Sequence, residues 1–330
     1  MRAIAIVGPT ASGKTRLSIP IARRLGAEIV SMDSRQVYRG MDVGTGKVTP
    51  EEREDIPHHG LDLVNPDERY SAGRFARDAR GWIDGIRLRG RLPLLVGGTG
   101  FFLRALAHPV FREPALEPER RQRLRGWLRG LDRQEMARWA GVLDPERARL
   151  ARAGGKQRLS RTIEVPLLTG HPLTWWHRWA SPEGDAIEIG VILLTLPREE
   201  LRRRIDGRVV RMFQGGLLDE TQGLLEAGFT VDAPGVTATG YREALRSIAG
   251  EIDLREAVRL AQGATRRYAR RQLTWFRNQP PRPDVTIDST APLANQIDRI
   301  VDWWEGIGAG GQSVRITPRA DCRPAGDPTP

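Results

Sequence analysis

The 330 residues are 39% hydrophobic and 28% charged, values typical of a globular protein with a large core. No apolar run is long enough to span a bilayer, no signal peptide precedes the first predicted strand, and the single cysteine, Cys322, excludes a disulfide framework or a cysteine-based zinc site. We therefore expect a cytoplasmic protein without membrane contact. The net charge of +11 favours a nucleic-acid partner, although a general bias towards basic residues would give the same charge.

The first predicted strand, residues 3–7, leads directly into a phosphate-binding pattern. The pattern is Gly-x-x-x-x-Gly-Lys-Thr, and it consists of Gly8, Pro9, Thr10, Ala11, Ser12, Gly13, Lys14 and Thr15. Glycines let successive amide groups turn towards an anion, and a helix predicted over residues 14–25 adds positive charge at its N-terminus. Lys14 supplies a point charge, and the Thr15 hydroxyl can reach a metal ion on the phosphates. The sequence predicts a diphosphate or triphosphate site, but this loop does not identify the ligand.

Two further predicted strands end in polar residues that should lie beside this loop. Residues 28–33 end in Asp33, and a strand from residue 92 ends in a Gly97-Gly98-Thr99 turn. Ligands of open parallel sheets bind at the carboxyl ends of the strands. Asp33 is therefore a candidate general base or metal ligand, and the alternative is a turn cap. Thr99 can likewise be the cap of the next helix, and the lack of an acidic residue after this strand argues against a motor ATPase or GTPase.

The order of the predicted elements indicates one α/β core with an insertion. Strands and helices alternate up to residue 113, which predicts a parallel sheet flanked by helices. Residues 114–185 are arginine-rich and helical, so we expect a helical insertion there. The core resumes over residues 186–307 with a strand at 187–196, long helices at 198–227 and 253–277, a short strand at 285–288 and a last helix at 291–307. Residues 308–330 are predicted to be a disordered tail.

Basic residues beyond the loop form three candidate contact surfaces. Arg204, Arg208 and Arg211 share one helical face, from which one could reach the phosphates, although a solvated face is the alternative. Residues 266–277 mix arginines with aromatics, and residues 156–161 form a second basic cluster; both suit RNA, although the aromatics could be core. Lysine is rare in this arginine-rich chain, which makes each one a candidate for a specific role; the lysines are Lys14, Lys47 and Lys156.

Together these stretches resemble the tRNA dimethylallyltransferase family, also called tRNA isopentenyltransferases. The matching blocks occur in the family's order and are residues 8–15, 33–47, 94–99, 157–161, 240–242 and 270–277. The resemblance implies a P-loop NTPase-like core in which the loop holds dimethylallyl diphosphate, assisted by Mg²⁺. It also implies transfer of the dimethylallyl group to N6 of the adenosine directly 3′ of the anticodon, after this base has left the anticodon stem-loop stack.

The resemblance also implies residue roles. Asp33 corresponds to the general base and Thr99 to a residue that forms hydrogen bonds beside it. Lys14, Thr15 and Arg208 correspond to the diphosphate and Mg²⁺ contacts. The implied tRNA contacts are Asp33, Ser34, Arg35, Gln36, Thr99, Arg121, Gln157, Arg158, Leu159, Ser160, Arg161, Thr237, Ala238, Thr239, Gly240, Tyr241, Arg242, Arg270, Arg271 and Arg277. Thr237 departs from the family pattern, because members often have arginine there.

Other functions remain open from the sequence. A P-loop small-molecule kinase would use Asp33 to activate an acceptor hydroxyl and would need no tRNA. An adenylate isopentenyltransferase would use the same donor on a free nucleotide and would not need the arginine-rich insertion. A non-catalytic RNA-binding protein could retain the loop as a relic. Nothing in the sequence indicates an oligomer interface, so we expect a monomer.

Overall fold

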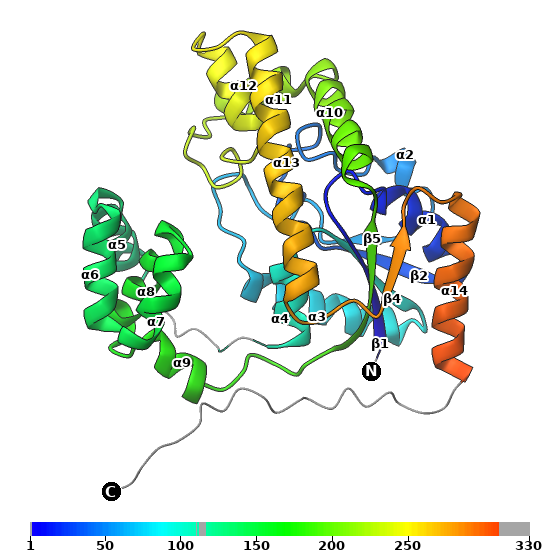
Figure 1. The fold of residues 1–330 in the computed structure, drawn as a ribbon, viewed down its shortest axis with the longest axis horizontal. Helices are drawn as coiled ribbons and strands as arrows, with labels where there is room; N and C mark the ends of the chain where they lie inside the picture. Colours follow the sequence, from blue (N-terminus) through cyan, green and yellow to red (C-terminus); the bar gives the residue numbers. More distant parts are fainter. Residues whose placement is uncertain (1, 110, 112–116, 310–330) are drawn as a thin grey trace, which may run out of the picture.

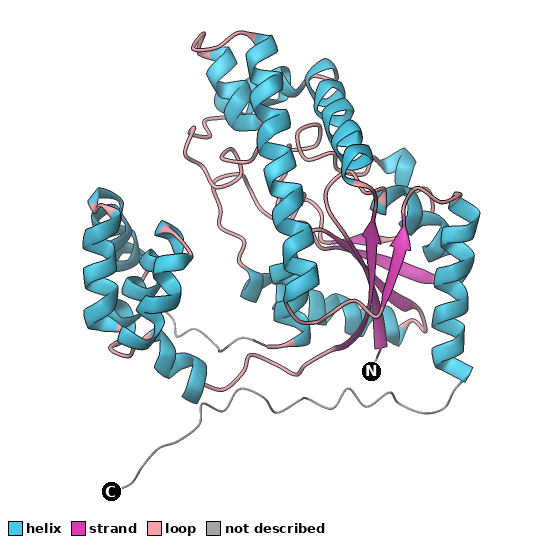
Figure 2. Ribbon diagram, viewed as in Figure 1, coloured by secondary structure: helices cyan, strands magenta, loops and turns pink. Residues whose placement is uncertain are grey.

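The core of the molecule is a parallel β-sheet, as the sequence predicts (Figures 1 and 2). The computed structural model describes residues 2–109, 111 and 117–309, so Cys322 and residues 310–330 of the predicted tail lie outside it. Six strands pair in the order β3-β2-β4-β1-β5-β6, and every pair is parallel. The strands are β1 (Arg2–Val7), β2 (Ala27–Ser31), β3 (His58–His59), β4 (Leu92–Gly97), β5 (Glu188–Thr195) and β6 (Val285–Asp288).

Strand β1 is central because its side chains are apolar on both faces, as buried parallel strands require. Ala3, Ala5 and Val7 pack on one face with helices α3 (Ala72–Leu88) and α4 (Gly100–Ala107). Ile4 and Ile6 pack on the opposite face with α1 (Lys14–Leu25) and α14 (Leu293–Ala309). The two helical layers exclude water from the sheet and fix the carboxyl ends of β1, β2 and β4 at one edge.

A second helical group covers that edge. It contains α10 (Arg198–Gln214), α11 (Leu217–Glu226), α12 (Tyr241–Ile248) and the long α13 (Leu254–Asn278), which pack on residues 37–64 around a shared apolar cluster. The predicted single helix over residues 198–227 is wrong, because the chain breaks between α10 and α11. Gly216 has a φ of +97°, a left-handed conformation that favours glycine and turns α11 in a new direction.

Residues 117–179 are described throughout, and they contain helices joined by short loops and no strand. These helices lie to one side of the sheet (Figure 1). They pack around a small core of their own that includes Leu128, Met136 and Leu159. Phe111 and Pro182 pair where the chain enters and leaves this region. The helices are α5 (Pro118–Gly130), α6 (Arg133–Leu143), α7 (Pro145–Ala153), α8 (Lys156–Thr169) and α9 (Leu173–Trp179).

The remaining helix, α2 (Pro50–Arg53), is a single turn between β2 and β3. Within the described part of the chain, no helix combines the length and apolar character needed to cross a membrane.

Candidate active site

The phosphate-binding loop leaves the carboxyl end of β1 and wraps the N-terminus of α1. Glycine is required at Gly8, because a Cβ there would lie 2.9 Å from the Leu194 carbonyl oxygen, and at Gly13, whose φ is +89°. Lys14 folds back over the loop, and its Nζ donates to the carbonyl oxygens of Gly8 (3.0 Å) and Pro9 (2.7 Å). Desolvation lowers the pKa of Lys14 to about 8, although the Asp33 carboxylate acts in the opposite direction. The loop therefore holds its charged lysine close to Asp33.

Asp33 and Thr99 meet at the same edge, where β2 and β4 end. The Thr99 amide donates to the Met32 carbonyl oxygen (3.3 Å), and the Ser34 amide donates to Thr99 Oγ1 (3.1 Å). The chains approach this closely because position 97 is glycine; a Cβ there would lie 2.0 Å from the Met32 carbonyl oxygen. Thr99 occupies the N-cap position of α4, but its side chain makes no capping hydrogen bond. Its hydroxyl is therefore directed to the turn that follows Asp33.

Asp33 has one fixed carboxylate oxygen, since Oδ1 accepts a hydrogen bond from the Arg35 amide (2.8 Å). This contact is the turn cap that the sequence left as an alternative role. The capping contact does not remove Asp33 from the site, because its side chain also lines the cavity next to the loop. Capping orients the carboxylate and leaves Asp33 available for chemistry.

A cavity of about 1320 Å³ lies between the loop and helices α10–α13. Its wall combines the phosphate loop, the segment after β2, the α10 arginines and the segment before α12. The predicted residues on this wall are Thr10, Ala11, Gly13, Lys14, Thr15, Asp33, Arg35, Gln36, Arg208, Thr237, Ala238, Thr239, Gly240, Arg242 and Arg271. One cavity thus joins stretches that are more than two hundred residues apart in the sequence.

Several α10 arginines line the cavity, and Arg208 is the one that binds the segment after β2. Its Nη2 donates to the Thr45 carbonyl oxygen (2.9 Å), and burial lowers the pKa of Arg208 while the Asp33 carboxylate partly offsets this. Arg204 also lies beside the loop, since a Cβ at Gly13 would be 3.9 Å from its Nη1, and it is paired with Glu200 (2.6 Å). The charges of Lys14 and Arg208 act on each other, so two cations share one site. An anionic ligand with more than one negative charge would satisfy both.

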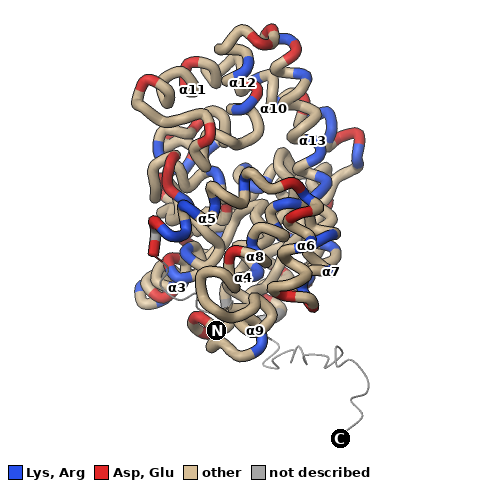
Figure 3. The backbone as a smooth tube through the Cα atoms, turned by 90° about the vertical axis from the view of Figure 1, so that its left-hand side faces the viewer, with Lys and Arg blue, Asp and Glu red and all other residues tan. Residues whose placement is uncertain are grey.

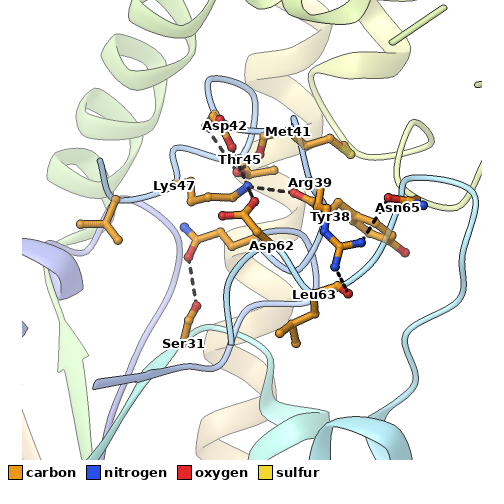
Figure 4. Close-up of polar contacts among 12 residues, drawn as sticks. Ser31, Tyr38, Arg39, Met41, Asp42, Thr45, Lys47, Asp62, Leu63 and Asn65 are labelled. Carbon is orange, nitrogen blue, oxygen red and sulfur yellow. Dashed lines mark hydrogen bonds and ion pairs between the residues drawn. The ribbon is translucent and has the colours of Figure 1, made fainter. Parts of the chain in front are cut away.

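The segment after Asp33 is held by a buried lysine (Figure 4). Lys47 has a side chain that is 3% exposed, and its Nζ donates to the Tyr38 carbonyl oxygen (2.8 Å) and pairs with Asp42 and Asp62. Gln36 accepts from Ser31 Oγ (3.1 Å) and donates to the Gly46 carbonyl oxygen (3.1 Å). Lys47, one of the lysines singled out from the sequence, thus binds groups of the protein itself and helps to hold the segment that forms part of the cavity wall.

Three residues predicted to contact tRNA near the cavity have side chains with internal partners. Arg35 Nη1 donates to the Pro234 carbonyl oxygen (2.7 Å), which links the Asp33 turn to the segment before α12. Tyr241 is fully buried, and its hydroxyl donates to Glu220 Oε1 (2.5 Å). Thr237 Oγ1 also donates to the Pro234 carbonyl oxygen (2.9 Å). These contacts shape residues 237–242 into a wall of the cavity.

The predicted contacts on the helical region lie away from the cavity wall. Arg121 and Arg125 both bind the buried Glu164, and Leu159 is in the local core. Arg158 and Gln157 are exposed on α8, and Ser160 and Arg161 are half-buried. Figure 3, in which α5 and α12 face the viewer, shows basic residues both on the helices α5–α9 and on the helices α10–α13. The structure therefore does not bring residues 157–161 together with Asp33.

Helix α13 also carries predicted contacts. Arg270, Arg271 and Arg277 are exposed, and the Arg271 guanidinium lies over the Tyr268 ring, 5.7 Å from its centroid. Tyr268 lines the cavity; burial raises the pKa of Tyr268 to about 12, and the nearby Asp33 carboxylate adds to this. The sequence left open whether Tyr268 was core, and the structure places it at the site.

Two site residues were missed by sequence reasoning. Gln272 is buried in α13, where its Oε1 accepts from the Thr10 amide (2.8 Å) and its Nε2 donates to the Gly98 carbonyl oxygen (2.9 Å). It thereby joins the loop to the strand end that carries Thr99. The second residue is Glu220, whose carboxylate accepts hydrogen bonds from backbone amides of residues 42–44. Gln272 lies within residues 270–277, one of the blocks that resemble the family, and a lone glutamine among arginines is the signal that could have identified it. No local sequence pattern marks Glu220.

Known proteins are similar to this chain over most of its length. A family model described as "IPP transferase" matches residues 36–279, and one described as "Isopentenyl transferase" matches residues 1–61. A curated tRNA dimethylallyltransferase from Anaeromyxobacter sp. (strain K) is 46% identical over 279 residues, covering 84% of this chain and 91% of that protein.

Solved structures show the same relationship. A tRNA isopentenylpyrophosphate transferase from Bacillus halodurans is 36% identical with a TM-score of 0.68, and the match covers 92% of this chain and 96% of that one. A eukaryotic dimethylallyltransferase solved acting on tRNA shares the fold, with 24% identity and a TM-score of 0.79 over 95% of this chain and 81% of that one. The extent of these matches shows that this chain belongs to the tRNA dimethylallyltransferase (IPP transferase) family.

Proposed function

We propose that this transferase, a tRNA dimethylallyltransferase, transfers a dimethylallyl group from dimethylallyl diphosphate to N6 of the adenosine directly 3′ of the anticodon. The observation that carries this proposal is the meeting of Asp33 with Lys14 and Arg208 at one cavity. A carboxylate that can accept a proton thus faces two cations that suit a diphosphate.

The P-loop and its two cations serve the leaving group. N6 attacks C1 of the donor, the C1–O bond breaks, and the electron pair of that bond leaves with the diphosphate. Lys14, Arg208 and the loop amides bind the charge that develops on the departing oxygen. This role explains why the site gathers cations beside a carboxylate and does not place an acidic metal ligand after β4.

Asp33 and Thr99 serve the acceptor. An exocyclic amine is a weak nucleophile, so removal of its proton by Asp33 as the N–C bond forms assists the reaction. The Arg35 amide holds one carboxylate oxygen in place (2.8 Å), which leaves the other oxygen for the proton. Thr99 lies beside this turn, because its Oγ1 accepts a hydrogen bond from the Ser34 amide. Its hydroxyl can form a hydrogen bond with the incoming base.

The residues present fit Mg²⁺ that is held mainly by the donor. Among the described residues, no group of three or more His, Cys, Asp or Glu side chains is arranged around a metal ion. Mg²⁺ commonly keeps several waters and binds phosphate oxygens, so one protein ligand is sufficient. The exposed Thr15 hydroxyl at the N-terminus of α1 would be that ligand. When bound, the ion would supply further neutralisation of the diphosphate charge.

The tRNA surface would include the helical insertion, residues 114–185, together with the basic residues of α12 and α13. The target base must leave its stack to reach the cavity, and we expect contacts with the RNA on both sides of the cavity opening. Exposed arginines on α8 and α13 supply charge for the RNA backbone, and the Thr237–Gly240 wall would receive the extruded base. We further propose that the enzyme acts as a monomer with Mg²⁺.

The test is transfer of labelled dimethylallyl from its diphosphate to an anticodon stem-loop. Asp33→Asn should reduce the rate at least a hundredfold with little change in RNA affinity, while Asp232→Asn, at an exposed position, should behave as the wild type. Unchanged turnover in Asp33→Asn would remove Asp33 from the base role. Equal transfer to free adenosine monophosphate, or ATP-dependent phosphorylation of a small acceptor, would favour the other enzyme classes.

A further inference from the structure

The loop over residues 42–46 is bound by one carboxylate from a distant helix. The backbone amides of Asp42, Val43 and Gly44 donate to the Glu220 carboxylate at 2.7, 2.7 and 3.0 Å. Successive amide groups that point to one place form an anion-binding nest. Here the anion is a side chain of α11, and the Tyr241 hydroxyl donates to the same carboxylate (2.5 Å). Glu220 thus receives four hydrogen bonds.

The other side of this loop is also fixed (Figure 4). Lys47 binds the Asp42 carboxylate and the Tyr38 carbonyl oxygen, and Thr45 Oγ1 donates to the Met41 carbonyl oxygen (2.6 Å). The Tyr241 ring leaves no room for a side chain at position 44, where a Cβ would lie 2.4 Å from a ring carbon. With contacts on both sides, the loop has little freedom to shift.

The carbonyl groups of the clamped loop are directed at the active site. The Thr45 carbonyl oxygen accepts from Arg208 Nη2 (2.9 Å), and the Gly46 carbonyl oxygen accepts from Gln36. Arginine has a long side chain with many rotamers, so a fixed acceptor is needed to hold its guanidinium in one orientation. The position of Arg208 therefore depends on the position of the Thr45 carbonyl group.

We propose that Glu220 is a positioning residue for the donor diphosphate, acting through Thr45 and Arg208. Its carboxylate holds the amides of residues 42–44, the loop presents the Thr45 carbonyl oxygen, and this oxygen aims the Arg208 guanidinium at the leaving group. Displacing a binding group by about 1 Å can lower a reaction rate up to a hundredfold. The inference rests on the proposed role of Arg208 in binding the donor.

A double-mutant cycle tests the link. Glu220→Gln keeps the size of the side chain but replaces one acceptor oxygen by an amide that faces N–H donors. We expect about a tenfold loss of kcat/KM for dimethylallyl diphosphate with an unchanged KM for the stem-loop. In an Arg208→Ala background the same substitution should add less than a twofold loss, because the group that it positions is gone. Glu226→Gln, exposed on the same helix, is the matched control.

Calorimetric binding of inorganic diphosphate distinguishes the role of Arg208 in donor binding from the role of Glu220 in positioning Arg208. If Arg208→Ala binds it as tightly as the wild type, the proposed role of Arg208 is wrong. If Arg208→Ala weakens binding but Glu220→Gln does not, or if the two effects multiply, Glu220 has only a structural role and the inference is overturned. Should Glu220→Gln not fold, Glu220→Asp enters the same cycle, and its shorter carboxylate should give a smaller loss with the same dependence on Arg208.

Discussion

The charge of Lys14 should determine how donor binding depends on pH. Desolvation lowers the pKa of Lys14 to about 8 in the ligand-free protein. A bound diphosphate favours the ammonium form and raises this pKa. Above pH 8, donor binding must therefore also take up a proton, and the affinity for dimethylallyl diphosphate should fall as the pH rises.

The size of the effect follows from the pKa. A group with a pKa of about 8 is charged in about 90% of molecules at pH 7 and in about 10% at pH 9. If Lys14 stays charged in the complex at both pH values, the Kd for the donor increases about tenfold between them. This ratio corresponds to about 1.4 kcal/mol of binding free energy.

Calorimetric titration with dimethylallyl diphosphate at pH 7 and pH 9 measures this change. Lys14→Arg is the control, because an arginine stays charged over the whole range and should give a Kd that does not vary with pH, whatever its absolute value. A wild-type Kd that is constant between the two pH values would refute the reasoning. The same pH dependence in Lys14→Arg would refute it as well, since another group would then be responsible.

Three further predictions concern the supports of the site. Gln272→Met leaves a P-loop amide and the buried Gly98 carbonyl oxygen without their partner, so urea unfolding should show a loss of about 2–4 kcal/mol; a loss below about 1 kcal/mol would contradict this. Gly46→Ala places a Cβ 2.3 Å from the Arg208 guanidinium at a φ of +57°, so the donor KM should rise about tenfold, and an unchanged KM would show that Arg208 is not needed. The Arg89 hydrogen bond holds the pKa of Glu28 at about 2, below its usual 4.5. The ionised Glu28 carboxylate therefore stabilises the folded protein fully above pH 4.5, and this contribution is lost as the pH falls towards 2. Glu28→Gln should therefore lower the free energy of unfolding by about 2 kcal/mol at pH 7 and by much less at pH 3; an equal difference at both pH values would exclude the carboxylate charge as the cause.

Much of the fold follows from short-range patterns. The apolar run before Gly8, the glycine loop and the alternation of strands and helices predict a parallel sheet, and the matched family and the strand pairing confirm it. The rule for strand ends predicts that Asp33 and Thr99 lie near the loop. The hydrogen bond from Ser34 to Thr99 joins the two strand ends, and Asp33 lines the same cavity as the loop. Their catalytic roles stay predictions until the transfer assay is done.

Other features could not be predicted from local patterns. Helical periodicity continues through residues 198–227, and only the left-handed conformation of Gly216 divides the segment into α10 and α11. Amphipathic spacing placed three arginines on one face of α10, and all three line the cavity, but it did not show which of them binds the segment after β2. Packing against residues 37–64 decides this, because it brings the Thr45 carbonyl oxygen within 2.9 Å of the Arg208 guanidinium.

The sequence by itself determined the sheet, the phosphate-binding loop and the identity of the charged groups, because each depends on residues close together in the chain. The tertiary structure alone decided how those groups are held. Gln272 binds the amide of Thr10 across 262 positions, and Glu220 binds that of Asp42 across 178. Such contacts leave no periodic signal, because a buried backbone amide accepts any suitably placed oxygen, and only the packing of α11 and α13 brings these side chains to it.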